Sequence, residues 1–136
     1  MCPRIVLIED DEDIRESLSD FLQSEGYSVQ TYPNGKEALD DLVKSETRPC
    51  LILLDLMMPV MDGFQFLKAR KNYGDALIQL PTYVVSAVAN KDVLKGQDVA
   101  GYLNKPLDIE HLLRIVEDHV GPERAQAKSK EKEMAS

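Results

Sequence analysis

Short apolar runs recur along this chain, and stretches with a helical pattern separate them. These runs, which are mostly rich in Val, Ile and Leu, are Ile5–Ile8, Leu51–Leu54, Thr82–Ala87 and Gly101–Asn104. The stretch Tyr27–Tyr32 alternates more strongly between apolar and polar residues. Continuous apolar runs of this length are typical of strands that are buried on both faces, as in a parallel sheet.

Between the runs, apolar residues recur every three or four positions, which is the spacing of one helix face. The patterns occupy residues 11–26, 34–45, 63–74, 88–100 and 108–121. Gly26 ends the first pattern as a glycine commonly ends a helix. The fourth pattern is the weakest, because Gly96 interrupts it and leaves room for only a short helix. The alternation predicts an α/β fold with a doubly wound parallel sheet.

Length and composition exclude several classes of protein for this chain. A length of 136 residues suggests one domain, which we place at residues 1–121, and a net charge of −8 argues against direct binding to nucleic acid or acidic membranes. The N-terminus turns acidic too early for a signal peptide, and no apolar stretch approaches the length of a membrane span. Cys2 and Cys50 are too few for a disulfide scaffold. We therefore expect a cytoplasmic protein.

Residues 122–136 are polar and are expected to form a disordered tail or an extension of the last helix.

Polar side chains follow the predicted strands at their carboxyl ends, where open parallel sheets bind ligands. They are Glu9, Asp10, Asp11, Asp55, Ser86 and Lys105. Clustered carboxylates repel one another and stay ionised only beside a cation, and Mg²⁺ prefers such oxygen ligands while it keeps waters for a phosphate. Carboxylates also form acyl phosphates. This edge therefore predicts phosphate chemistry, with Asp55 as nucleophile, Lys105 neutralising a phosphate oxygen and Ser86 donating a hydrogen bond.

Each of these residues also has an ordinary structural interpretation. The acidic triplet Glu9–Asp11 is favourable at the start of any helix, and Asp55 after a strand is commonly a turn residue. A serine such as Ser86 within an apolar run is usually a core residue whose hydroxyl has a hydrogen-bond partner. Lys105 before Pro106 is usually part of a solvent-exposed turn. Their joint placement at four strand ends favours the functional interpretation.

The motifs "LLDLMMPVMDG" (residues 53–63), "VSA" (85–87) and "GYLNKPLD" (101–108), together with the first strand and its acids, carry a family resemblance. Over residues 4–120 the chain resembles the receiver domain of bacterial response regulators, especially the single-domain chemotaxis and sporulation phosphorelay regulators. The resemblance implies a flavodoxin-like (βα)5 fold with strand order 2-1-3-4-5 and a short fourth helix.

The resemblance also implies residue roles. Asp55 would accept a phosphoryl group from a histidine kinase or a histidine phosphotransfer protein. Mg²⁺ would be bound by Asp10 directly, by Glu9 through water, by Asp55, and by the backbone carbonyl of Met57. Asp11 is an alternative ligand.

Three further roles follow from the same resemblance. Ser86 and Lys105 would bind the phosphoryl group, Pro106 would follow a cis peptide bond, and Tyr102 would be the switch aromatic that swings inward when Ser86 moves. The segment from Ser86 to Lys105 is shorter than is usual in the family, which puts a standard output dimer in doubt. Met57 and Val88 are apolar, so we hypothesise that they hinder water and lengthen the life of the phosphoryl group.

These features predict a phosphorylation-controlled signalling module and not a metabolic enzyme, although it would catalyse its own phosphotransfer and autodephosphorylation. One alternative is a pseudo-receiver that binds its partner without phosphorylation. The other is an aspartyl-phosphate phosphohydrolase, which is disfavoured because Met57 stands where such enzymes place a second acid. The tail is too short for a helix-turn-helix. The output partner or domain is therefore unknown, and the chain either docks to a partner or is a receiver from a longer protein.

Overall fold

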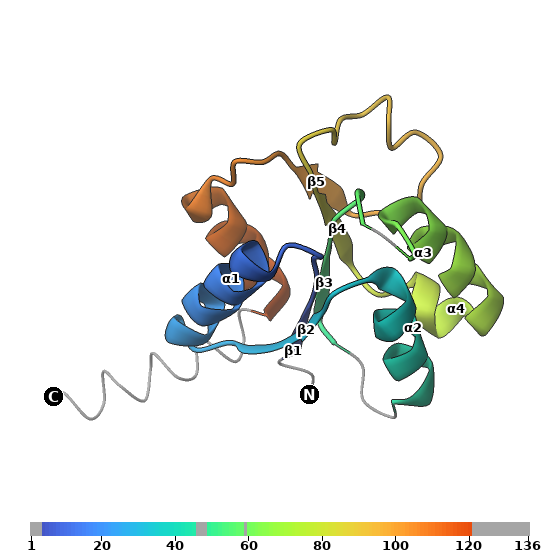
Figure 1. Cartoon of the computed structure of the whole chain (residues 1–136), viewed down its shortest axis with the longest axis horizontal. Helices are drawn as coiled ribbons and strands as arrows, with labels where there is room; N and C mark the ends of the chain where they lie inside the picture. Colours follow the sequence, from blue (N-terminus) through green and yellow to red (C-terminus); the bar gives the residue numbers. More distant parts are fainter. Residues whose placement is uncertain (1–3, 46–48, 59, 121–136) are drawn as a thin grey trace, which may run out of the picture.

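The computed structural model describes residues 4–45, 49–58 and 60–120. Five parallel strands form one sheet in the order β2-β1-β3-β4-β5, which confirms the predicted topology (Figure 1). The strands are β1 (Arg4–Ile8), β2 (Ser28–Tyr32), β3 (Leu51–Leu54), β4 (Thr82–Val85) and β5 (Gly101–Leu103). Each strand lies within one or two residues of its predicted range.

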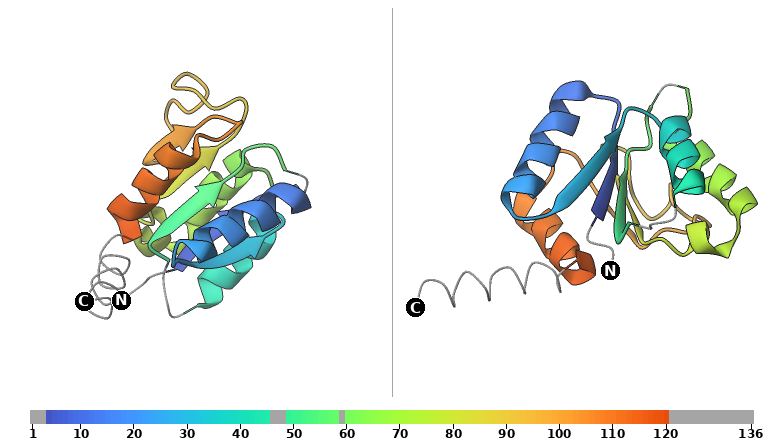
Figure 2. Two further views of the ribbon diagram at one scale, coloured as in Figure 1. Left: turned by 90° about the vertical axis from the view of Figure 1, so that its left-hand side faces the viewer. Right: turned by 90° about the horizontal axis from the view of Figure 1, so that it is seen from below.

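Helices cover both faces of the sheet (Figures 1 and 2). The helix α1 (Glu12–Ser24) and the helix of residues 109–120 cover one face, whereas α2 (Gly35–Lys44), α3 (Gly63–Ala69) and α4 (Asp75–Ile78) cover the other. The 3-10 helix η1 (Arg70–Tyr73) continues α3. In the ranges that the structure describes, no helix combines the length and the apolar character that a membrane span requires.

The central strand β3 explains the most continuous apolar run of the sequence. Leu51 and Leu53 pack into the cluster beneath α1, whereas Ile52 and Leu54 pack into the cluster beneath α2 and α3. Successive side chains of a strand point to opposite faces, so a strand between two helical layers must be apolar throughout. Full burial of each such side chain stabilises the fold by about 1.5–3 kcal/mol. The burial of β3 fixes the place of the residue that follows it, Asp55.

Short polar side chains begin the helices. The Asp11 carboxylate accepts a hydrogen bond from the Ile14 amide at 3.1 Å at the start of α1. At α3, Asp62 and Gln65 form a reciprocal capping box, so the Asp62-Gly63 pair begins this helix. Pro59, which precedes this pair in the same motif, lies outside the described residues.

The predicted short fourth helix between β4 and β5 is wrong. Residues 87–96 form turns, and no helix is present in the described segment between these two strands. The Asn90 carboxamide accepts from the Val93 amide at 2.8 Å, and Gly96 has a left-handed φ of 81°. The Asn90 bond caps a short run of turns, and the left-handed Gly96 ends that run, so the segment does not continue as a helix. The helix α4, which precedes β4, was not predicted.

A buried arginine ties down the far end of this segment. Arg70 is 1% exposed and donates from Nη1 to the Thr82 hydroxyl at 2.7 Å. Its Nη2 donates to the backbone carbonyl of Asp98. Arg70 thus joins η1 to β4 and to the residues just before β5. Helical spacing alone did not indicate this role, because an arginine at the end of a helical pattern is ordinarily solvated.

Candidate functional site

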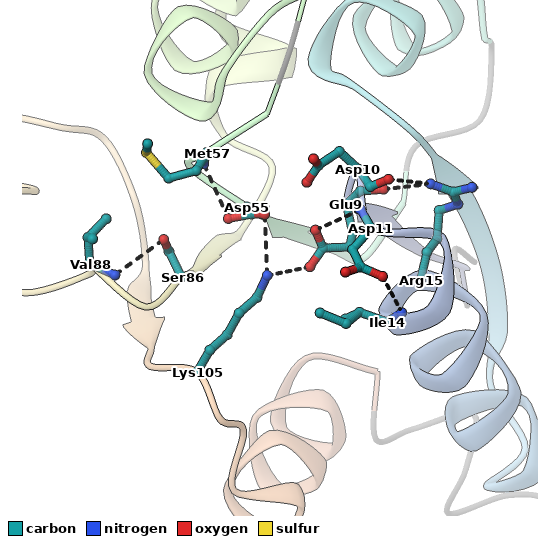
Figure 3. Close-up of polar contacts among 10 residues, drawn as sticks. All are labelled: Glu9, Asp10, Asp11, Ile14, Arg15, Asp55, Met57, Ser86, Val88 and Lys105. Carbon is teal, nitrogen blue, oxygen red and sulfur yellow. Dashed lines mark hydrogen bonds and ion pairs between the residues drawn. The ribbon is translucent and has the colours of Figure 1, made fainter.

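Asp55 stands at the carboxyl end of β3 and is 5% exposed (Figure 3). Its amide donates to the Ile8 carbonyl at 3.0 Å, which extends the pairing of β1 and β3 by one residue. One carboxylate oxygen, Oδ1, accepts from the Met57 amide at 3.2 Å, and Oδ2 lies 3.3 Å from the Lys105 ammonium. The backbone and one amide therefore orient this carboxylate before any ligand arrives.

Lys105 joins two acids that come from different strands. Its Nζ lies 2.5 Å from Oε1 of Glu9 and 3.3 Å from Oδ2 of Asp55. The peptide bond between Lys105 and Pro106 is cis, as the family resemblance implied. Lys105 reaches the site because β5 ends beside β4, whose carboxyl end lies next to that of β3.

Glu9 is 2% exposed, and this burial shapes the electrostatics of the site. Burial, together with the neighbouring Asp55 carboxylate, raises the pKa of Glu9 to about 7 against the opposing effect of Lys105. Burial alone lowers the pKa of Lys105, but the contacts with Glu9 and Asp55 outweigh it and raise the pKa above its ordinary value. Lys105 thus offsets only part of the cost of burying the Glu9 carboxylate beside Asp55.

Three carboxylates at this edge fit a divalent metal ion. Glu9, Asp10 and Asp55 each offer an oxygen, and these oxygens all lie within 4.8 Å of one another. Glu9 and Asp55 are buried whereas Asp10 is exposed, so the cluster opens to solvent on one side. Such an all-oxygen set suits a hard cation such as Mg²⁺. Asp11 lies outside this group, and its carboxylate caps α1 instead.

Arg15 supports this acidic edge, and sequence reasoning did not find that role. Its Nη1 donates to the backbone carbonyl of Glu9 at 2.9 Å and to that of Asp10 at 3.4 Å. Figure 3 shows the guanidinium of Arg15, which projects from α1, turned back toward these two residues. The available signal was the position of Arg15, one turn into the helix that the acidic triplet begins.

Ser86 lies on the other side of Asp55 from the acidic pair, as Figure 3 shows. Ser86 is 2% exposed, and its hydroxyl oxygen accepts from the Val88 amide at 3.4 Å. A serine hydroxyl can accept and donate at once, so it can still donate to a ligand. The side chains of Met57 and Val88 flank this part of the site, with exposed fractions of 65% and 47%.

Tyr102 is half-buried on β5, two residues before Asn104. It packs against a small cluster formed by Leu56, Val84, Ala89 and Leu94. It also borders a cavity of about 410 Å³ that Asn104, Pro106 and His111 line. Tyr102 thus lies between the segment after Ser86 and the open edge of the sheet.

Residues 5–117 match the family model of the response regulator receiver domain. The chain belongs to this family. As a receiver domain it serves two-component signalling, and the order of its strands is the one that the sequence predicted.

Related proteins agree with this assignment. The receiver is 39% identical over 113 residues to the response regulator MprA of Mycolicibacterium vanbaalenii, a match that covers 81% of this chain and 47% of MprA. It is 38% identical over 116 residues to MprA of Mycobacterium tuberculosis, with 83% of this chain and 48% of that protein covered. The chain thus spans about half the length of these curated relatives.

Solved structures resemble the receiver over most of its length. The chemotaxis protein CheY4 of Vibrio cholerae is 30% identical with a TM-score of 0.74, and the match covers 88% of this chain and 99% of CheY4. The receiver domain of the Francisella response regulator 1452 is 26% identical with a TM-score of 0.75, and the match covers 88% and 98% of the two chains. These neighbours are consistent with the chemotaxis-regulator-like fold that the motifs predicted.

Proposed function

We propose that this receiver accepts a phosphoryl group on Asp55 from a phosphohistidine donor, either a histidine kinase or a histidine phosphotransfer protein. The observation that carries the proposal is the contact of Lys105 with both Glu9 and Asp55 beside a third carboxylate. An Asp55 oxygen attacks phosphorus and forms a new O–P bond. The P–N bond of the phosphohistidine breaks, and its electron pair remains on the imidazole.

The neighbouring residues take the roles that their positions support. Lys105 binds one oxygen of the transferring group and the Ser86 hydroxyl donates to another. Asp10, Asp55, the Met57 carbonyl and, through water, Glu9 would hold Mg²⁺, which would offset negative charge on the phosphoryl group. The same residues support autodephosphorylation, because they also surround the phosphorus when water attacks it.

The donor protein docks beside the site in this proposal. A cavity of about 420 Å³ lies between α1 and the residues that follow Lys105, and its apolar lining comes from Ile14, Leu18, Leu107 and Ile109. Small-molecule phosphodonors need no such surface. Ile14→Glu should therefore slow transfer from a phosphohistidine protein and leave the rate with acetyl phosphate unchanged. If the wild type and Ile14→Glu accept phosphoryl groups from the phosphohistidine protein at the same rate, docking at this cavity is contradicted.

Phosphorylation then controls an output through Tyr102, whose half-buried place beside the segment after Ser86 supports a switch role. The chain spans about half the length of its curated relatives. The output that it controls is therefore either a further domain or a separate partner protein. The bacterial sources of those relatives support a bacterial cytoplasmic setting.

The proposal is tested by incubation with acetyl phosphate and Mg²⁺ followed by intact mass measurement. The wild-type chain should gain one phosphoryl group, Asp55→Asn should gain none, and Asp118→Asn, which alters an exposed acid on the helix of residues 109–120, should behave as wild type. No gain in the wild type would favour the pseudo-receiver. Rapid turnover of acetyl phosphate without accumulation would favour the phosphohydrolase.

A further inference from the structure

Asn104 holds the turn that carries Ser86. The side-chain amide of Asn104 donates to the Ala89 carbonyl at 2.6 Å and to the Ser86 carbonyl at 3.4 Å. These carbonyls belong to the two ends of one tight turn, which the Ala89 amide closes by donating to the Ser86 carbonyl at 3.4 Å. A carboxamide has two N–H donors, so one Asn104 side chain can hold both ends of the turn.

Backbone bonds from the strand after the turn reach only Ser86, its first residue. The Ser86 amide donates to the Leu103 carbonyl at 3.0 Å, and the Lys105 amide donates to the Ser86 carbonyl at 3.4 Å. Beyond Ser86 the ladder between β4 and β5 ends. The Val88 amide, which donates to the Ser86 hydroxyl, lies inside the turn. The direction of the turn therefore determines where the Ser86 hydroxyl points.

No helix follows to hold this turn from the far side, because residues 87–96 in the described structure form only turns. Leu94 provides the next buried anchor, and the Asn90 cap orders the middle of the segment. The carboxamide of Asn104, which directly follows β5, thus holds the start of the segment. Asn104 itself is exposed, so its amide acts at the surface and not within the core.

We propose that Asn104 is a positioning residue for phosphoryl transfer, which holds the Ser86 hydroxyl toward Asp55 through the turn Ser86–Ala89. This inference rests on the proposed function. Asn104 does not itself contact the reacting atoms; it acts through Ser86. The adjacent Lys105 contacts Asp55 directly, so two neighbouring residues after β5 place the hydroxyl and the ammonium together. Small displacements of a group that binds the transferring phosphoryl lower the rate strongly.

The test uses Asn104→Leu, which has a similar volume and lacks both donors. Asn90→Leu is the matched control, because the Asn90 carboxamide orders the same segment but accepts its hydrogen bond from the Val93 amide. The rate of phosphoryl gain from acetyl phosphate is measured at saturating Mg²⁺, and the affinity for Mg²⁺ is measured by calorimetry. Asn104→Leu should slow the rate about tenfold with unchanged Mg²⁺ affinity, whereas Asn90→Leu should stay within about twofold.

A double-mutant cycle separates positioning from general damage to the fold. In the Ser86→Ala background, Asn104→Leu should produce no further loss, because the group that it positions is already absent. An equal loss in both backgrounds, or a wild-type rate for Asn104→Leu, would overturn the inference. If the Leu variant does not fold, Asn104→Ala, which also lacks both donors, serves with the same expectations. Failure of the wild-type chain to gain a phosphoryl group would instead overturn the proposed function, and this inference with it.

Discussion

The Lys105 ammonium lies 2.5 Å from the Glu9 carboxylate, although 96 residues separate them in the chain. Lys105 thus acts as a cation for the acidic cluster while it also reaches Asp55 at 3.3 Å. A divalent ion bound by the same acids would lie close to the Lys105 ammonium, and the two positive charges would repel each other.

Lys105→Met should therefore tighten Mg²⁺ binding by about fivefold, because removal of a nearby like charge lowers the cost of adding the ion. The same variant should gain phosphoryl groups more slowly, because the phosphoryl oxygen loses its ammonium partner. Calorimetry and intact mass measure the two effects. Lys44→Met, which removes a charge at the far end of α2, is the control and should change neither. Weaker Mg²⁺ binding in the Lys105 variant would contradict this account.

The rim of the site should control how long the phosphoryl group survives. Met57 and Val88 are apolar and lie beside Asp55 and Ser86, so we expect them to restrict the approach of water to a phosphoryl group. Met57→Asn should shorten the half-life of the phosphorylated form about threefold or more, and Val43→Asn on α2 should leave it unchanged. A wild-type half-life of only seconds in Mg²⁺ buffer would be inconsistent with shielding.

Gly63 allows α3 to approach the strand that ends at Asp55. A Cβ at this position would stand 2.6 Å from the Asp55 carbonyl oxygen and 2.8 Å from the Leu56 Cα. Gly63→Ala should lower the free energy of unfolding by about 2–3 kcal/mol and slow phosphorylation, because backbone must shift. Gly74→Ala, where φ is 95° and no atom lies near, should cost only about 1 kcal/mol. Urea titrations compare the two, and equal losses would refute the steric explanation.

Tyr32 should make folding stability depend on pH in the alkaline range. Its hydroxyl donates to Asp41 at 2.9 Å, and burial, followed by the Asp41 contact, raises its pKa to about 12. The folded state holds this proton more tightly than the unfolded state, so its contribution is complete below pH 10 and is lost as pH rises toward 12. Tyr32→Phe should flatten this part of the curve of unfolding free energy against pH. An unchanged slope would show that other groups cause it.

The periodic apolar patterns predicted most of the fold. The polar residues that follow the predicted strands placed Glu9, Asp10, Asp55 and Lys105 at one edge of the sheet. These features depend on local patterns, because a strand such as β3 must be apolar throughout and the carboxyl ends of parallel strands share an edge. The structure places the three acids within 4.8 Å of one another. The same patterns could not decide between Asp11 as a ligand and as a cap, since both uses suit an acid before a helix.

The segment between β4 and β5 was beyond sequence reasoning for a physical reason. Its conformation depends on Arg70 and Asn104, which lie outside the segment and reach it through side-chain hydrogen bonds. Neither contact leaves a periodic pattern. Helical spacing alone suggested a short helix there. In the structure the segment forms turns, which the hydrogen bonds of Arg70 and Asn104 and the cap at Asn90 hold in place.

The central claim is that Asp55 carries the phosphoryl group, and its most direct test is chemical mapping of the modified residue. The chain is treated with acetyl phosphate and Mg²⁺, reduced with borohydride, digested and sequenced by mass spectrometry. Because borohydride reduces an acyl phosphate to an alcohol, this account predicts homoserine at position 55, only when Mg²⁺ is present. Homoserine at another acid, or an unmodified Asp55 in a chain that has gained phosphate, would contradict it.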